Sequence, residues 1–234
     1  MNAKVADREK QSWDPIWEDI FVSQDWGKYP PEELIRFIAR NYYKAPDRKK
    51  VSILEIGCGA GACVWFAARE GFSAVGIDGS KTAIEKAEKL LKDNDLEAEF
   101  IVGDVMHLDQ LVNGRQFDAI YDVGCLQCNT LSNMQLIIDK IFDRLAAGGR
   151  FFSIAVSSES PGANKGTEIE KGTFVDIQEG PLKGRGLNHF TTLEEMQTLL
   201  SKFTSVEIDF CKRSFSNRQG FYSNWVCSAM KPKP

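Results

Sequence analysis

Short runs of apolar residues alternate along this chain with segments in which apolar residues recur every three or four positions. The first pattern predicts buried strands, and the second predicts helices with one apolar face. Strands are expected at residues 51–56, 73–78, 98–104, 117–124 and 150–157. Because helical segments separate these runs, the pattern predicts an α/β fold with a mostly parallel, doubly wound sheet and helices on both faces.

Residues 134–145 carry the clearest helical pattern, and the glycine pair at 148–149 is expected to end that helix. Two overlapping capping boxes within residues 191–195 predict the start of a later helix. The last two apolar segments, 205–215 and 221–230, have no helix between them. They are therefore expected to form a hairpin of antiparallel strands.

Two segments lie outside this alternation. Residues 1–44 contain three tryptophans, and Pro31 can start an amphipathic helix there, so we expect an N-terminal helical cap segment. The remaining residues, 45–234, are expected to form one domain. Within it, residues 157–190 contain six glycines and interrupt the path from the fifth strand to its helix. A connection of this length in a compact domain is typical of a lid, so a glycine-rich lid insertion is expected.

Composition narrows the class of protein. The chain has 234 residues, of which 43% are hydrophobic, and its formal net charge is −4. This charge argues against a nucleic-acid-binding protein, which usually carries a surplus of positive charge. No apolar run approaches the roughly 20 residues of a membrane helix, and the first residues lack the apolar core of a secretory signal. We therefore expect a cytoplasmic protein that does not associate with membranes.

The cysteine pattern favours reduced thiols over a disulfide framework in such a compartment. Cys125 and Cys128 form a CxxC pair among the six cysteines of the chain. However, no second pair follows at the spacing of a zinc site, and the chain has only two histidines. No metal site is expected.

Candidate chemistry begins at the stretch ILEIGCGAG, residues 53–61, where a strand runs into a glycine-rich turn. Gly57, Gly59 and Gly61 would let the backbone approach a ligand closely, and the following helix would direct unpaired amides to the same place. Alone, this turn is a weak signal that also fits a strand-to-helix connection without a ligand. Glu55, just before it, could bind the ammonium group of an amino acid.

Two aspartates at the ends of the next strands extend the site. Asp78 is placed to accept hydrogen bonds from the two hydroxyl groups of a ribose. Asp104, followed by the apolar Val105 and Met106, would suit an adenine, with a carboxylate near the exocyclic amine and apolar side chains against the ring. An amino acid joined to a nucleoside satisfies Glu55, Asp78 and Asp104 together.

The stretches ILEIGCGAG, GIDGS, VGDVMHL and FDAIYDVG, in this order and spacing, resemble the successive motifs of class I S-adenosylmethionine-dependent methyltransferases. LAAGGRFF is similar to their turn into the fifth strand, and the resemblance covers about residues 50–156. It implies a seven-stranded sheet of order 3-2-1-4-5-7-6 with strand 7 antiparallel. It also implies S-adenosyl-L-methionine as the cofactor and S-adenosyl-L-homocysteine as the product.

The resemblance assigns roles to residues of this chain. The three glycines would cradle the methionine part, and Asp122 with Val123 would lie beneath the sulfonium. Asp78, with Gly79 and Ser80 beside it, would hold the ribose. Asp104, Val105 and Met106 would hold the adenine.

The flanking segments resemble, more loosely, a group of bacterial methyltransferases associated with polysaccharide or small-metabolite clusters. That resemblance implies a small-molecule acceptor, such as a sugar or a related metabolite.

Trp13 and Trp17 could close over the methionyl end of the cofactor, where aromatic faces attract a sulfonium, or could simply pack a first helix onto the core. The candidate acceptor-site residues are Lys28, Tyr29, Cys125, Lys183 and Arg185, and each of the charged ones also suits a solvated loop.

His189 is the candidate general base, because it precedes a helix that should start at the ligand-binding edge of the sheet. Packing beside Phe190 is the competing interpretation.

The predicted reaction moves a methyl group to an oxygen or nitrogen of a small acceptor. The alternatives are methylation of a protein or RNA, an NAD-dependent oxidoreductase, and a non-catalytic nucleoside-binding protein. The sequence does not indicate the oligomeric state.

Overall fold

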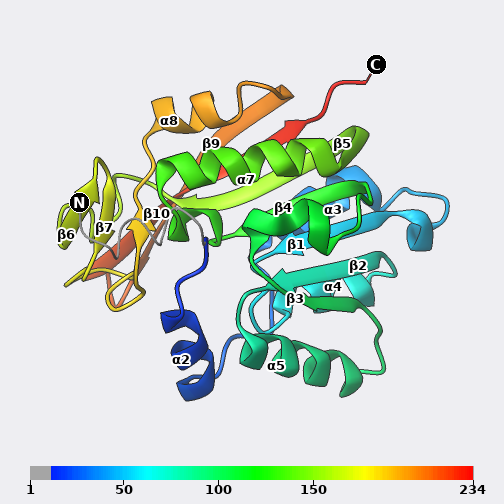
Figure 1. The fold of residues 1–234 in the computed structure, drawn as a ribbon, viewed down its shortest axis with the longest axis horizontal. Coiled ribbons are helices and arrows are strands. Elements are labelled where there is room, and N and C mark those ends of the chain that lie inside the picture. Colours follow the sequence, from blue (N-terminus) through cyan, green and yellow to red (C-terminus); the bar gives the residue numbers. More distant parts are fainter. Residues whose placement is uncertain (1–11, 234) are drawn as a thin grey trace.

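The computed structural model describes residues 12–233. Its centre is a seven-stranded sheet of order β3-β2-β1-β4-β5-β10-β9 (Figure 1). The strands are β1 (Ser52–Ile56), β2 (Ser73–Asp78), β3 (Glu99–Val102), β4 (Phe117–Val123), β5 (Leu145–Val156), β9 (Thr204–Phe215) and β10 (Gly220–Met230). The strands β1 to β5 pair in parallel, and β10 is antiparallel to both β5 and β9. This arrangement confirms the predicted strand order and the antiparallel hairpin.

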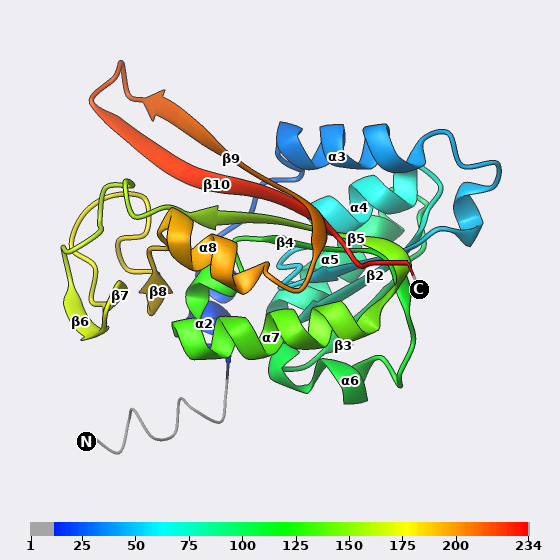
Figure 2. The same ribbon diagram turned by 90° about the horizontal axis from the view of Figure 1, so that it is seen from above.

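Helices cover both faces of the sheet, as predicted (Figure 2). Leu34, Phe37 and Ile38 of α3 (Glu32–Tyr42) pack on one face together with α4 (Ala62–Arg69) and α5 (Lys81–Lys92). The opposite face packs against α6 (Leu108–Leu111), α7 (Leu131–Arg144) and α8 (Leu193–Leu199). The remaining helical elements are α2 (Ile16–Ser23) and the 3-10 turns η1 (Arg48–Lys50), η2 (Val105–His107) and η3 (Leu126–Cys128).

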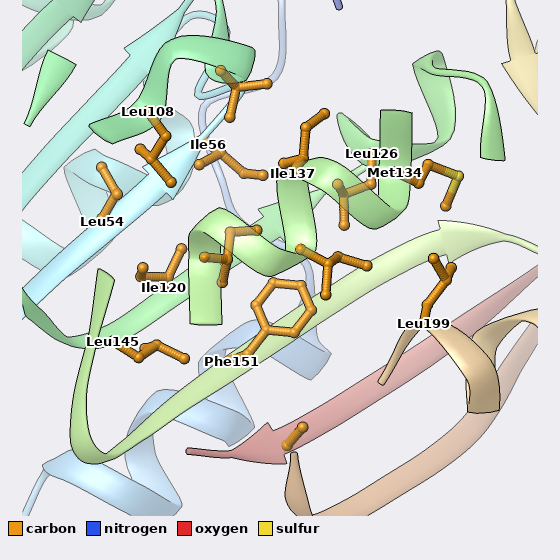
Figure 3. Close-up of a cluster of buried hydrophobic side chains, with 14 of the residues drawn as sticks. Leu54, Ile56, Leu108, Ile120, Leu126, Met134, Ile137, Leu145, Phe151 and Leu199 are labelled. Carbon is orange, nitrogen blue, oxygen red and sulfur yellow. The ribbon is translucent and has the colours of Figure 1, made fainter. Parts of the chain in front are cut away.

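The core on the α7 side shows why the apolar pattern of the sequence specifies these elements (Figure 3). Leu54 and Ile56 of β1 point toward this side, where Ile137 of α7 and Phe151 of β5 meet them, and all four side chains are buried. Ile53, one residue earlier than Leu54, packs on the α4 side. Strands buried on both faces read as continuous apolar runs, which is the pattern found at residues 51–56.

Two boundaries differ from the sequence prediction. The helix α7 ends at Arg144, and Leu145 already has an extended backbone and pairs with Phe117. The strand β5 therefore begins five residues before Arg150, and the glycine pair lies within it. Leu145 continues the apolar pattern of the helix because it is buried in the same core as α7, so periodicity could not reveal the change of backbone.

The glycine-rich insertion also contains more structure than expected. Three short strands form a second sheet of order β6-β7-β8, at Thr167–Glu170, Thr173–Val175 and Asn188–His189. The helix α8 uses the second of the two possible capping boxes, in which Thr192 and Glu195 bond reciprocally. No helix among residues 12–233 has the length and apolar character needed to cross a membrane.

Candidate active site

A cavity of about 450 Å³ opens at the carboxyl ends of β1, β2 and β4. The turns after these strands form one side of it, and the segment around α2 forms a second side. Pro181, Leu182 and Arg185 of the insertion complete it. Figure 1 shows α2 below this edge of the sheet, apart from the helices that cover the two faces. Segments that are distant in the sequence therefore meet around one space.

The turn between β1 and α4 lies against the loop that follows β4. Gly57 has a φ of +62°, and a Cβ built on it would lie 2.4 Å from the Cβ of Cys125. Any other residue at this position would be strained and would clash, which explains the glycine. Gly57 and Gly59 both line the cavity. Gly61 instead caps the start of α4, where it packs against Ala87.

Asp78, at the end of β2, ties this turn to the next strand. One carboxylate oxygen accepts a hydrogen bond of 2.8 Å from the Gly59 amide, and the other accepts one of 2.8 Å from the Ser80 amide. Burial raises the pKa of Asp78, and these two amides act in the opposite direction. Each carboxylate oxygen can accept more than one hydrogen bond, so the group can still bind hydroxyl groups in the cavity.

Asp104 is covered by the N-terminal segment in this structure. Its carboxylate accepts hydrogen bonds from the Met106 amide at 2.9 Å, from the Ser12 amide at 2.7 Å and from the Ser12 hydroxyl. The Trp13 ring lies so close to Gly79 that a Cβ there would be 2.5 Å from it. We call Ser12 and Trp13 the strap, because together they cross the ends of β2 and β3.

Glu55 is buried beside the glycine turn, with 3% of its surface exposed. Its Oε2 atom has no hydrogen-bond partner among the described residues. Burial raises the pKa of Glu55 well above its ordinary value, and a hydrogen bond from the Cys63 thiol acts in the opposite direction. A buried acceptor without a partner is costly, so this atom is arranged for a donor that residues 12–233 do not supply.

Asp122 lies behind the cavity wall and not in it. Its carboxylate accepts hydrogen bonds from the Cys125 amide (2.7 Å), the Leu126 amide (3.0 Å) and the Ser153 hydroxyl (2.7 Å). Burial raises the pKa of Asp122 to about 6. The carboxylate therefore fixes the loop whose residues Val123 and Cys125 line the cavity.

Aromatic side chains form a wall beside the glycine turn, where a Cβ built on Gly59 would lie 3.1 Å from the Phe21 ring. The ring centroids of Trp17 and Phe21 are 6.2 Å apart, those of Phe21 and Trp26 are 5.4 Å apart, and all three residues line the cavity. The Trp17 indole also donates a hydrogen bond to the Cys128 thiol, which links α2 to η3. The spacing of Trp17 and Phe21 by one helical turn could have revealed this wall in the sequence.

Of the other predicted acceptor-site residues, Tyr29, Cys125 and Arg185 line the cavity. Lys28 instead donates a hydrogen bond of 3.0 Å to Asn94 and lies 4.9 Å from the Trp65 ring centre. Lys183 is exposed and is not part of the cavity lining. The sequence could not predict where these two lysine side chains point, because both lie on loops.

His189 does not reach the cavity in this structure. It is fully buried, with Nδ1 2.7 Å from the Thr173 hydroxyl and Nε2 3.3 Å from the Glu195 carboxylate. The pairing of β7 with β8 places it there. The ring nitrogens are engaged by Thr173 of the insertion and by Glu195 of α8, so the competing interpretation of His189 as a packed residue describes its surroundings better than the role of a base does.

The loop after β4 supplies two cavity residues that the sequence did not single out, Gln127 and Asn129. Gln127 accepts a hydrogen bond of 2.6 Å from the Val156 amide. The Asn129 amide group donates to the Cys125 and Leu126 carbonyls, and its Oδ1 atom is buried without a partner among residues 12–233. No group of three or more potential ligands in this part of the chain is arranged to hold a metal ion.

Residues 47–188 match the family described as a methyltransferase domain. Among curated proteins, norajmaline N-methyltransferase of Rauvolfia serpentina is 32% identical over 99 residues, which cover 41% of this chain and 32% of that protein. Ubiquinone biosynthesis O-methyltransferase of Pelagibacter ubique is 31% identical over 122 residues, which cover 45% of this chain and 50% of that protein. The chain thus spans between about a third and a half of the length of these relatives.

Solved structures show the same fold. A SAM-dependent methyltransferase from Methanosarcina mazei has a TM-score of 0.63 and 25% identity, with 78% of this chain and 92% of that chain covered. One from Anabaena variabilis has a TM-score of 0.67 and 15% identity, with 99% and 96% covered. Magnesium protoporphyrin IX methyltransferase from Synechocystis, solved with bound SAH, has a TM-score of 0.61 and 13% identity, with 99% and 88% covered.

Proposed function

Since the chain belongs to the methyltransferase-domain family, as a class I S-adenosylmethionine-dependent member, we propose that it transfers a methyl group from S-adenosylmethionine to an oxygen or nitrogen of a small-molecule acceptor. The observation that carries this proposal is one cavity whose lining includes the glycine turn, Glu55, Asp78 and the aromatic wall described above. Family membership decides against the oxidoreductase alternative.

The cavity residues at or just after the ends of β1, β2 and β3 suit the cofactor. The unpaired Glu55 Oε2 atom matches an ammonium group. Asp78 retains the capacity to accept hydrogen bonds from ribose hydroxyls, and Val105 offers an apolar contact for the adenine. When bound, S-adenosylmethionine supplies a methyl group that is already activated by the sulfonium.

The other residues position the acceptor and exclude water. Alignment of two reactants can contribute about 7 to 11 kcal/mol, so a methyl transfer need not depend on one catalytic side chain. Asn129 Oδ1 is placed to accept a hydrogen bond from an acceptor hydroxyl or amine. Burial raises the pKa of the Cys125 thiol well above its ordinary value, so this cavity-lining thiol stays neutral and unreactive at pH 7.

The acceptor is proposed to be small because the aromatic wall and the insertion enclose the cavity on the sides away from the sheet. Norajmaline and ubiquinone biosynthesis, which the names of the curated relatives mention, also involve small molecules. A protein or an RNA would require an extended groove, and a net charge of −4 does not favour RNA.

Calorimetry with S-adenosylhomocysteine, S-adenosylmethionine and NAD tests the cofactor. Binding of the first two and not of NAD is expected, and binding of NAD alone would overturn the proposal. Incubation with labelled S-adenosylmethionine and a panel of phenols, sugars and amines should then give a labelled small product. Label found only in protein or RNA would contradict the small-molecule acceptor.

A further inference from the structure

One positively charged side chain lines the part of the cavity that we assign to the acceptor, and it has no role in the cofactor binding proposed above. Among the described residues that line the cavity, Arg185 is the one with a positive side chain, and Glu55 and Asp78 are the negative ones. Both carboxylates lie beside the glycine turn, whereas Arg185 belongs to the insertion. The charges of the cavity are therefore divided between its two halves.

Arg185 is held in a fixed place. Its guanidinium lies 5.1 Å from the centre of the Trp26 ring, and Nη2 donates a hydrogen bond of 3.2 Å to the Gln24 side chain. Its carbonyl accepts a hydrogen bond of 3.2 Å from Asn188. Stacking on an aromatic face and a bonded Nη2 atom pre-organise the guanidinium, so binding through Nη1 costs little further entropy.

A second guanidinium nitrogen, Nη1, is buried and has no hydrogen-bond partner among residues 12–233. A buried donor on a charged group is expensive to leave unpaired, and an anionic oxygen is the partner that compensates it best. The neighbouring wall is aromatic, with Trp17, Phe21 and Trp26 offering flat apolar surfaces. Such a wall packs well against a planar ring.

We infer that Arg185 determines acceptor specificity, and that the acceptor is an aromatic acid: a planar ring packed on the wall of Trp17, Phe21 and Trp26, with a carboxylate bound by the guanidinium. This inference rests on the proposed function, because it assigns the acceptor half of the same cavity. The carboxylate of the cofactor is the competing partner for Arg185. The amides at the start of α4, next to the cavity-lining Ala60 and Ala62, offer the cofactor carboxylate a separate partner.

The test measures binding of 3,4-dihydroxybenzoate and its neutral amide, 3,4-dihydroxybenzamide, to the full chain saturated with S-adenosylhomocysteine. The acid should bind about tenfold more tightly than the amide, since the amide oxygen can still accept a hydrogen bond from the guanidinium but lacks the negative charge that strengthens it. Arg185→Gln should remove this preference, and Arg185→Lys should restore part of it. Lys183→Gln, which removes a charge from the same loop outside the cavity, should leave the preference unchanged.

Calorimetry with S-adenosylhomocysteine on each variant separates the possible failures. Unchanged affinity of Arg185→Gln for S-adenosylhomocysteine, together with loss of the acid preference, supports the inference and shows that the variant is folded. Equal binding of acid and amide to the unaltered protein, or no binding of either, would overturn it. So would a large loss of S-adenosylhomocysteine affinity in a folded Arg185→Gln. Failure of the unaltered protein to bind S-adenosylhomocysteine would instead contradict the proposed function.

Discussion

Glu55 carries a buried carboxyl group whose charge depends on what occupies the cavity. Without a cation nearby, burial raises its pKa well above 4.5, so the neutral form is favoured. An ammonium group at Oε2 would favour the carboxylate. Binding of the cofactor should therefore release a proton from Glu55 at pH values between 4.5 and the raised pKa of the free protein.

The expected result is that affinity for S-adenosylhomocysteine rises with pH in this range, with release of up to one proton per site. Calorimetry in buffers of different ionisation enthalpy measures the released protons directly. Glu55→Gln keeps the shape of the side chain and cannot titrate, so it should show weaker binding and no proton release from this position. Equal proton release in both proteins would rule out Glu55 as the ammonium partner.

Asp122 provides a second prediction at the scale of one residue, this time on stability. Its pKa is raised from 3.8 to about 6 in the folded protein, so the folded state holds the proton more tightly than the unfolded state. The stability that results is fully present below pH 3.8 and is lost as the pH rises through about 6. A difference of this size corresponds to about 3 kcal/mol of unfolding free energy.

Asp122→Asn removes this titration while it preserves an oxygen acceptor for the amides of Cys125 and Leu126. Between pH 3 and pH 8 the unfolding free energy of the unaltered protein should therefore fall by about 3 kcal/mol relative to that of the variant. Urea unfolding at a series of pH values measures both curves. Ser153→Ala, which removes one donor to the carboxylate, should move the fall to higher pH. Parallel curves for the unaltered protein and Asp122→Asn would contradict the assignment.

At the scale of elements, the strap of Ser12 and Trp13 and the carboxylate of Asp104 interact where the adenine is proposed to bind. The Ser12 hydroxyl donates to the same carboxylate that the exocyclic amine would use. We therefore expect the strap to compete with the cofactor, so Ser12→Ala should bind S-adenosylhomocysteine several-fold more tightly. The limit is the roughly tenfold gain that corresponds to a charge-assisted hydrogen bond of about 1.5 kcal/mol.

Ser23→Ala is the matched control for this prediction. Ser23 lies in the same N-terminal segment, but its hydroxyl bonds only to the Asp19 and Ile20 carbonyls of its own helix. This variant should bind S-adenosylhomocysteine as the unaltered protein does. Weaker binding by Ser12→Ala would show that the strap supports the cofactor instead of competing with it.

The helix α2 and the aromatic wall should be needed for turnover more than for folding. Glu18 bonds to the side chains of Ser80 and Thr82, so α2 is attached at the start of α5 and is not part of the clusters that form the core of the sheet. Deletion of residues 1–28 removes Trp17, Phe21 and Trp26. Methyl transfer to any acceptor should fall at least tenfold, while circular dichroism shows an intact sheet. Unchanged turnover would reject the role of this wall.

The same elements show what the sequence could predict and why. β1, β2 and β4 are buried on both faces, so they appear as apolar runs, and the turns after them are fixed by local chemistry, such as the close approach of Gly57 to Cys125. The strand order then follows from the family resemblance. In contrast, β6, β7 and β8 have two to four residues each, which is too short for a periodic pattern.

For the molecule as a whole, the sequence predicted the strand-end residues Glu55 and Asp78 that line the cavity. It predicted only part of the lining that comes from the loops and the N-terminal segment, namely Trp13, Trp17, Tyr29, Cys125 and Arg185. Asp78 and Glu55 come directly from strands whose ends must meet at one edge of the sheet. Asn129 and Phe21 were not singled out, because they reach the cavity from the loop after β4 and from α2, whose relative placement depends on tertiary packing. His189, the candidate base, lies outside the cavity in this structure, since the pairing of β7 with β8 places it in the second sheet.

Because the cavity is built from the sheet, the N-terminal segment and the insertion, a ligand within it should stabilise the whole chain. A ligand at 100 times its dissociation constant stabilises the folded state by about 2.7 kcal/mol. For a chain of 234 residues, this should raise the unfolding temperature by roughly 5 to 10 °C. Differential scanning calorimetry with S-adenosylhomocysteine, and with NAD at the same concentration, measures the shift.

The distribution of tryptophans shows whether that stabilisation includes the aromatic wall. Trp13, Trp17 and Trp26 lie in the N-terminal segment, whereas Trp65 and Trp225 belong to the body of the fold. With S-adenosylhomocysteine bound, fluorescence and circular dichroism should follow a single unfolding transition, because the ligand contacts both parts. With Trp65 and Trp225 replaced by phenylalanine, fluorescence reports the N-terminal segment alone. Its melting before the sheet in the liganded protein would show that the wall does not close over the cofactor, and binding energy would then come from the sheet edge only.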